Sequence, residues 1–432
     1  MALRPDPGRA AGEPGRLRGT AGRDALVARA LARPVKTIVL VYVLTRLLAL
    51  AAMWAAATCV QNPAGVGHLN PTVADLFGLW DAQWYRRIAE GGYPVPLPVD
   101  PQTGIITYSA WAFYPAFPLL VRAGTAIGLP FPVAGLLVNL PLGLLGALIV
   151  WRIFGLATHA APQAHRDRLA LVAACLWCFY PATGVLLIPY SEALALVVIA
   201  GTLFLVMRRS YWLAALTLLG LGYTRAVAPA LGLAILVHLV ARARDERRSG
   251  TRLFAGDRCA LIVLTVSVAV SALAWPATVG MLTGRPSAFF DVQKAWGQEP
   301  QNGPFVLWLA WAWEARGVFG VALIVGIVAA YLALVAGRHG QWLPLEVRAW
   351  ALAYPLYLLA VVRPITSMWR FLLLDFPAAA LVASVAMRTS AGERIVPHWR
   401  RRVALVALAL CAGMAWWTVA FLTYVPWAAT PP

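Results

Sequence analysis

One acidic residue, Asp81, lies in a polar and aromatic stretch of a chain that is otherwise strongly apolar. The stretch runs from Leu79 to Pro94, follows the first long apolar segment and contains Arg86 close to the carboxylate. A carboxylate held at a membrane surface, with aromatic side chains around it and an arginine nearby, is suited to accept a proton from an arriving hydroxyl group. The pattern therefore favours proton transfer at Asp81.

The composition indicates which elements must position this carboxylate. Hydrophobic residues make up 61% of the 432 residues and charged residues 12%, and the mean hydropathy is +0.71. These values are typical of an all-α polytopic membrane protein. The net charge of +18 comes from arginines in short clusters between apolar runs, as expected of cytoplasmic loops that face anionic lipids. We therefore expect membrane lipids as partners and no nucleic acid, and the abundance of Ala and Arg favours a bacterial source.

The apolar runs predict about eleven membrane spans within one domain, residues 35–424. A basic disordered tail, 1–34, should precede it in the cytoplasm, and a short tail, 425–432, should follow it outside. A single long span across 211–241 would invert the later topology. The predicted spans are 35–60, 130–154, 169–187, 190–207, 211–222, 226–241, 259–282, 317–336, 347–362, 369–387 and 403–424.

Positive-inside counting places the arginine clusters in the cytoplasm and two long loops, 61–116 and 283–316, outside the cell membrane. The same alternation of spans places four charged residues, Glu192, Arg225, Arg363 and Arg370, at the outer ends of different spans. Ionisable groups near hydrocarbon are costly unless they face a cavity or a partner, so these residues predict one shared polar chamber. Asp81 should lie at its mouth.

The first outer loop should contain two interfacial helices. Trp80, Trp84 and Ile88 recur at a spacing of four and would line one face of the first helix, which Gly91 and Gly92 should end. The apolar run 119–129 is too short to span a bilayer comfortably and predicts a second helix that is interfacial or partly inserted.

Several of these segments together resemble the PIG-V-type mannosyltransferases, a branch of the GT-C membrane glycosyltransferases. The resemblance extends from about residue 37 to residue 380. Its departures are Ala82-Gln83 after the aspartate, Tyr114 where a second Phe is common, and Trp369 before the arginine. The matching segments are Trp80-Asp81, Trp84-Tyr85, Ile88-Ala89, Gly92-Tyr93-Pro94, Phe113-Tyr114-Pro115-Ala116-Phe117-Pro118, Pro189-Tyr190-Ser191-Glu192, Ser367-Met368-Trp369-Arg370-Phe371 and Asp375-Phe376-Pro377.

The resemblance implies inverting transfer of mannose from a polyprenyl-phosphate-mannose donor to a lipid or glycan acceptor on the non-cytoplasmic face, with Asp81 as general base. The leaving phosphate would be stabilised by Arg225, Arg363 and Arg370, in rising order of preference. No cofactor is expected, a single outer aspartate neither requires nor excludes a divalent cation, and the six scattered histidines predict no metal site. The predicted substrate-binding residues are Trp80, Gln83, Trp84, Tyr85, Tyr114 and Glu192.

Each assignment has a structural alternative. Asp81 could simply complement the dipole at a helix N-terminus. Glu192 and Arg225 could form a structural ion pair, and Arg363 and Arg370 could extend their side chains toward the membrane surface. For the whole chain, the alternatives are a transporter or lipid flippase and a non-catalytic scaffold of the cell envelope. The aromatic residues that could form a belt at the level of the lipid headgroups are Trp80, Trp84, Tyr85, Trp111 and Tyr114.

Overall fold

The computed structural model of the protein describes residues 27–157, 163–250, 255–298, 303–388 and 394–424. Within these ranges the regular structure is helical, and β-pairing is limited to the isolated bridges Val99 with Ile106 and Arg388 with Ile395. The predicted all-α class is confirmed. The prediction of a disordered tail lies outside the described residues up to residue 26, but residues 27–32 are helical, which that prediction missed. The predicted tail 425–432 also lies outside them.

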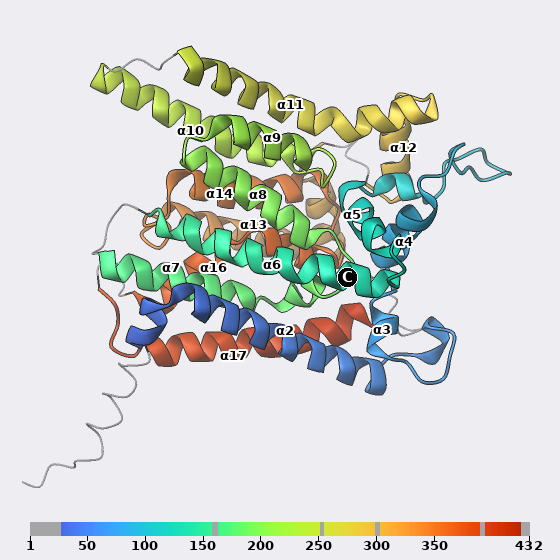
Figure 1. The fold of residues 1–432 in the computed structure, drawn as a ribbon, viewed down its shortest axis with the longest axis horizontal. Helices are drawn as coiled ribbons and strands as arrows, with labels where there is room; N and C mark the ends of the chain where they lie inside the picture. The colour runs from blue at the N-terminus through green and yellow to red at the C-terminus, as the bar shows by residue number, and fades with distance from the viewer. Residues whose placement is uncertain (1–26, 158–162, 251–254, 299–302, 389–393, 425–432) are drawn as a thin grey trace, which may run out of the picture.

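Most of the described chain forms one bundle of long helices (Figure 1). Every predicted span overlaps one of these helices, so apolar length was a sufficient signal for their existence. The bundle helices are α2 (Pro34–Cys59), α6 (Phe131–Gly155), α7 (Gln163–Cys178), α8 (Glu192–Met207), α9 (Tyr211–Leu221), α10 (Ala228–Ser249), α11 (Ala255–Thr283), α13 (Val306–Ala336), α14 (Leu345–Val361), α16 (Pro377–Met387) and α17 (Trp399–Trp417).

The structure supports fewer membrane crossings than the eleven predicted. Five helices in the described chain, α2, α6, α11, α13 and the α17 segment to Leu422, are long and apolar enough to cross, and a bent pair could supply a sixth. Several of the other bundle helices are too short to cross a membrane alone. The eleven residues of α9, for example, rise only about 16 Å. A polytopic membrane protein is therefore confirmed, whereas the count of eleven is not.

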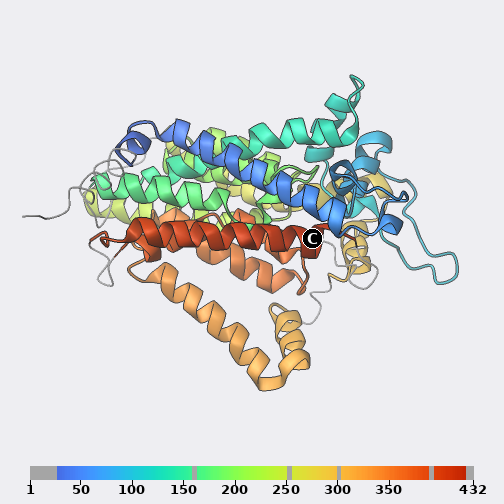
Figure 2. The ribbon, with the colours of Figure 1, turned by 90° about the horizontal axis from the view of Figure 1, so that it is seen from below.

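Proline and glycine account for the main departures from the predicted spans. The span 169–187 ends as an α-helix at Cys178, and Pro181 begins the 3₁₀-helix Pro181–Leu186. The span 369–387 is broken into Met368–Leu374 and Pro377–Met387, which meet at 80°. In α13 the helix begins at Val306 and kinks at Arg316 and Gly317, and Figure 2 shows it projecting from the bundle. The region 211–241 forms two helices, α9 and α10, and not one long span.

Short helices gather at one end of the bundle, on the right of Figure 1. They are α3 (Val73–Leu76), α4 (Asp81–Gly91), α5 (Ala116–Thr125) and α12 (Ala288–Ala295). Two basic helix ends, the C-terminus of α10 and the N-terminus of α17, lie at the opposite end (Figure 1). The bundle therefore separates its basic helix ends from the first predicted outer loop.

Candidate functional site

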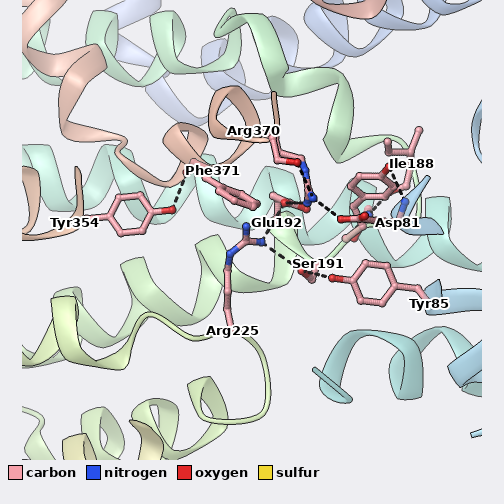
Figure 3. Close-up of polar contacts among 12 residues, drawn as sticks. Asp81, Tyr85, Ile188, Ser191, Glu192, Arg225, Tyr354, Arg370 and Phe371 are labelled. Carbon is pink, nitrogen blue, oxygen red and sulfur yellow. Dashed lines mark hydrogen bonds and ion pairs between the residues drawn. The ribbon is translucent and has the colours of Figure 1, made fainter. Parts of the chain in front are cut away.

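Two carboxylates each occupy the first position of a helix at the end of the bundle that carries the short helices. Asp81 begins α4 and Glu192 begins α8. The free N–H groups of a helix N-terminus favour a negative charge there. Figure 3 shows the two carboxylates on either side of the Arg370 guanidinium. The fold thus gives two acidic residues from distant parts of the chain a common cationic partner.

Arg370 joins both carboxylates directly. Its Nη1 donates to Glu192 Oε1 at 2.7 Å, and its Nη2 donates to Asp81 Oδ2. Arg225 Nη1 donates to the same Glu192 Oε1 at 3.0 Å. The result is a four-charge cluster of Asp81, Glu192, Arg225 and Arg370 in which two negative and two positive charges balance (Figure 3). Of the four residues predicted to share a polar chamber, Glu192, Arg225 and Arg370 lie together beside Asp81, and Arg363 forms no ion pair with them within the described residues.

A shell of hydroxyl groups holds the four-charge cluster in place. The Asp81 N–H donates to the hydroxyl oxygen of Tyr190 at 3.2 Å, and the ring of Tyr190 lies 5.1 Å from the Arg370 guanidinium carbon. Tyr85 donates to Ser191 Oγ at 2.9 Å. Asn139 in turn fixes the backbone at Tyr190, because its side-chain amide donates to the Tyr190 carbonyl at 3.0 Å. The cluster is therefore built into the packing of α4, α6 and α8.

The Asp81 carboxyl is partly exposed, with 16% of its side-chain surface accessible, whereas Glu192 is fully buried. Burial raises the pKa of Asp81 above its ordinary value, Arg370 opposes that rise, and the negative charge of Glu192 adds to it. Oδ2 is engaged by Arg370, and Oδ1 has no hydrogen-bond partner within the described part of the chain. Asp81 thus presents a carboxylate oxygen that is more basic than usual and open to a ligand.

A cavity of about 1010 Å³ opens beside Asp81. Six of the ten predicted site residues line it, and they are Trp80, Asp81, Gln83, Trp84, Arg363 and Arg370. The cavity lining does not include the other four, Tyr85, Tyr114, Glu192 and Arg225. Within the described ranges the Arg363 guanidinium forms no ion pair, so its charge is available to the cavity. The roles of all ten residues remain predictions.

The headgroup-belt interpretation is wrong for two of the aromatic residues. Tyr85 and Trp111 are 5% and 1% exposed and lie in the protein interior. The predicted face of the first loop helix is also wrong, because α4 begins at Asp81 and leaves Trp80 outside it with a φ of +56°. The residues of α4 that are buried are Ala82, Tyr85, Ile88 and Ala89.

Trp80 instead connects the Asp81 turn to the last described segment of the chain. Its indole N–H donates to the Leu422 carbonyl at 3.0 Å, and its ring lies 6.0 Å from that of Tyr424. Gln61 Oε1 accepts from the Tyr424 N–H at 2.8 Å in the same region. A positive φ is unfavourable for a bulky residue, so these contacts must hold the backbone turn that places Asp81 at the helix start.

Sequence reasoning missed the side chains that support Arg370. This residue lies in the short helix α15 (Met368–Phe371), on the broken segment between α14 and α16. A broken helix leaves carbonyl groups without helical partners, and here aromatic side chains supply the missing donors. The hydroxyl or indole donors are Tyr180 to the Trp369 carbonyl (2.8 Å), Tyr354 to Phe371 (2.8 Å), Trp177 to Leu373 (3.0 Å) and Trp350 to Leu374 (3.0 Å). The Asp375-Phe376-Pro377 sequence was the available signal, since proline favours a break.

No group of three or more His, Cys, Asp or Glu side chains that could hold a metal ion occurs in the described residues. The statement that Asp81 neither requires nor excludes a divalent cation therefore stays a prediction.

The fold and site define a polytopic membrane protein with a charged cavity at one end of its helix bundle. No family model matches the chain. Among curated proteins, it is similar to "GPI alpha-1,6-mannosyltransferase 2" of Mus musculus, with 32% identity over 147 residues. The match covers 32% of this chain and 27% of the mouse protein, so the chain spans about a quarter of that relative. Part of the chain is thus similar to a mannosyltransferase.

Proposed function

We infer that the protein is a membrane glycosyltransferase of GT-C type. It transfers a sugar, mannose in the simplest case, from a polyprenyl phosphate to a hydroxyl acceptor on the non-cytoplasmic face of a bacterial cell membrane. The observation that carries this inference is the Asp81 carboxylate, which lines a large cavity and keeps one oxygen without a partner in the described chain. The partial similarity to a mannosyltransferase supports the same reaction class.

The proposed reaction is an inverting displacement at the anomeric carbon. The acceptor oxygen attacks this carbon from the face opposite the phosphate, while Asp81 Oδ1 removes the proton of the acceptor hydroxyl. The bond between the anomeric carbon and the phosphate oxygen breaks, and its electron pair leaves with the polyprenyl phosphate. A carboxylate with a raised pKa suits this step, because in its ionised form it is a stronger base than an exposed aspartate.

The four-charge cluster also supports departure of the phosphate. The cluster is balanced before the reaction, so protonation of Asp81 leaves it with one net positive charge. This charge develops while the leaving phosphate becomes more negative. Arg363, which lines the cavity without an ion pair in the described residues, is the best placed cation to contact the phosphate directly. Arg363 is therefore preferred as the phosphate-binding residue, whereas the sequence alone favours Arg370.

The test compares membranes that contain wild type, Asp81→Asn or Glu90→Gln at equal abundance. Glu90 lies on the same helix α4 in an exposed ion pair with Arg86 and does not line the cavity, so Glu90→Gln is the matched control. Labelled mannose from polyprenyl-phosphate-mannose should enter a lipid or glycan product with wild type and Glu90→Gln. Asp81→Asn should lose at least about a hundredfold in rate, the usual size of a general-base effect.

Two results would oppose the proposal. Equal transfer by Asp81→Asn and wild type would remove the base role of Asp81 and leave the enzyme class standing. Movement of labelled lipid between the leaflets, without a covalent product from any polyprenyl-linked sugar, would favour the flippase alternative.

A further inference from the structure

Part of the cavity lining consists of aromatic rings and amides that the proposed reaction does not use. Four rings, Trp84, Tyr108, Phe113 and Trp296, form what we term the aromatic wall, and all four line the cavity. Trp296 is the centre of this wall, with ring centroids 4.7 Å from Tyr108, 5.4 Å from Trp84 and 5.5 Å from Phe113. The wall therefore joins α4, the loop before α5 and the end of α12.

The aromatic wall still exposes ring surface to the cavity. Tyr108 is 59% exposed, and the other three rings are partly exposed. Arg87 lies 4.6 Å from the Trp84 ring centroid and covers part of that ring. The most exposed ring of the wall is that of Tyr108, and the ring of Trp296 lies beside it. Exposed aromatic faces in a large cavity are a frequent feature of ligand sites.

Three glutamines accompany these rings on the cavity wall: Gln83, Gln293 and Gln298. Gln298 Oε1 accepts from the Arg363 N–H at 3.2 Å, and the Arg363 guanidinium occupies the space that a side chain at Gly297 would need. Gly297, with a φ of +72°, lets the loop close over Arg363 and fixes Trp296 and Gln298 on either side. An amide both donates and accepts hydrogen bonds, so it can pair with a hydroxyl group in either role.

Charged side chains are few in the cavity lining. The Asp, Glu, Lys, Arg and His residues among the lining residues are Asp81, Arg363 and Arg370, and the four rings of the aromatic wall carry no charge. An uncharged ligand rich in hydroxyl groups suits the wall better than an anionic lipid headgroup or a charged peptide. A pyranose fits these features, because its C–H groups can lie on the electron-rich face of a ring while its hydroxyls reach the amides.

We propose that the aromatic wall, with its three glutamines, is a carbohydrate subsite that binds a pyranose of the acceptor. The assignment of this pyranose to the acceptor rests on the proposed function. Trp84 lies one helical turn from Asp81 on α4, so a ring on the wall has its hydroxyls near the base. The apolar residues of the lining, which include Leu79, Ile365 and Phe371, are left for the polyprenyl donor. The acceptor is accordingly a glycan, bound through its sugar and not through a lipid tail.

The test measures binding of octyl α-mannoside and of 1-octylglycerol to the purified full-length protein in lipid nanodiscs, by saturation-transfer NMR below the micelle concentration. The two probes share a tail and differ in the sugar ring. Wild type should bind the mannoside more tightly than octylglycerol. Tyr108→Leu and Trp296→Leu should each weaken mannoside binding by about tenfold, with no change for octylglycerol. Trp313→Leu, an exposed tryptophan on α13 that does not line the cavity, should match wild type.

Tyr108→Leu protects the test against misfolding of Trp296→Leu, because Tyr108 is mostly exposed. Equal binding of the two probes by wild type, or mannoside binding that neither variant weakens, would overturn the proposal. Tighter binding of an uncharged serine peptide than of the mannoside would also overturn it.

A kinetic arm separates the acceptor sugar from the donor sugar. Hydrolysis of polyprenyl-phosphate-mannose, without acceptor, should keep its donor KM in Tyr108→Leu, whereas the KM for octyl α-mannoside as acceptor should rise about tenfold. A raised donor KM in hydrolysis would assign the wall to the donor sugar and overturn the acceptor assignment. If wild type neither hydrolyses nor transfers but binds the mannoside through the wall, the proposed function fails while the carbohydrate subsite stands.

Discussion

Asp81 and Glu192 have the same local setting but different surroundings. Each begins a helix, and each bonds to Arg370. Glu192 is fully buried and has a second arginine, Arg225, on the oxygen that Arg370 uses. Asp81 lines the cavity, retains 16% of its side-chain surface and has Arg370 as its one arginine partner among the described residues.

The difference shows how one fold can assign opposite tasks to similar carboxylates. A fully buried carboxylate between two guanidinium groups has little freedom to accept a proton, because its ionised form is what holds the two arginines. A carboxylate at the cavity edge, desolvated on one side and open on the other, can exchange a proton with a ligand. Glu192 therefore positions Arg370 and Arg225, and Asp81 is the residue that can take part in chemistry.

The largest expected difference between substitutions of Glu192 and of Asp81 is in the stability of the protein. Glu192→Gln leaves the buried Arg370 and the partly buried Arg225 without their shared carboxylate and should lower the free energy of unfolding by about 3–5 kcal/mol. Asp81→Asn should change it much less, because Arg370 keeps Glu192. Thermal unfolding of the detergent-solubilised proteins, followed by size-exclusion chromatography, measures both. Equal destabilisation by the two variants would break the distinction between a positioning carboxylate and a reactive one.

A second effect concerns pH and applies to Asp81. The base must be ionised, so kcat/KM should fall as pH decreases through the pKa of Asp81, by about tenfold per pH unit below it. Burial raises this pKa, so the fall should occur at a higher pH than for an exposed aspartate, whose pKa is about 3.9. The pH profile of transfer between about pH 4 and 8 measures the position of this limb. The residual activity of Asp81→Asn should lack it, and a limb that persists in this variant would assign the titration to another group.

The long-range convergence of charges was predictable from sequence. Arg225, Arg370 and Glu192 could be placed near Asp81 because each lies at the end of an apolar run, and a charged group is costly within hydrocarbon. Alternation of the runs then sent all of them to the same side. The bundle helices were predictable for the same reason, since long apolar runs have few other stable arrangements in a membrane.

Local backbone conformation and contacts across long loops were not predictable. Nothing in the spacing of Trp80 and Trp84 indicated that Trp80 adopts a positive φ and leaves the helix. Tyr108 and Trp296 meet on one wall although 188 positions separate them, and no periodic pattern connects two irregular loops. Pro377 could indicate a break in its apolar run, but the donors that support the broken segment come from other parts of the chain and could not be inferred.

This break leads to the smallest predicted effect, because it carries the arginine that Asp81 and Glu192 share. Tyr354 donates to the Phe371 carbonyl, one residue from Arg370, at 2.8 Å (Figure 3). Tyr354→Phe removes that donor and leaves the carbonyl unpaired, which should cost about 1 kcal/mol of stability. The Arg370 segment should also become less well positioned, so kcat should fall a few-fold, by roughly the factor that 1 kcal/mol represents, with little change in the donor KM.

Tyr42→Phe is the matched control for this last prediction, because Tyr42 donates to the Leu140 carbonyl at 3.0 Å in a contact between α2 and α6. Both variants lose one tyrosine hydroxyl that supports a helix carbonyl, so both should lose a similar amount of stability. Only Tyr354→Phe should reduce kcat, since only its carbonyl belongs to the segment that carries Arg370. If the two variants reduce kcat equally, the donors to the broken segment support the bundle in general, and the position of Arg370 between the two carboxylates must be set by its ion pairs alone.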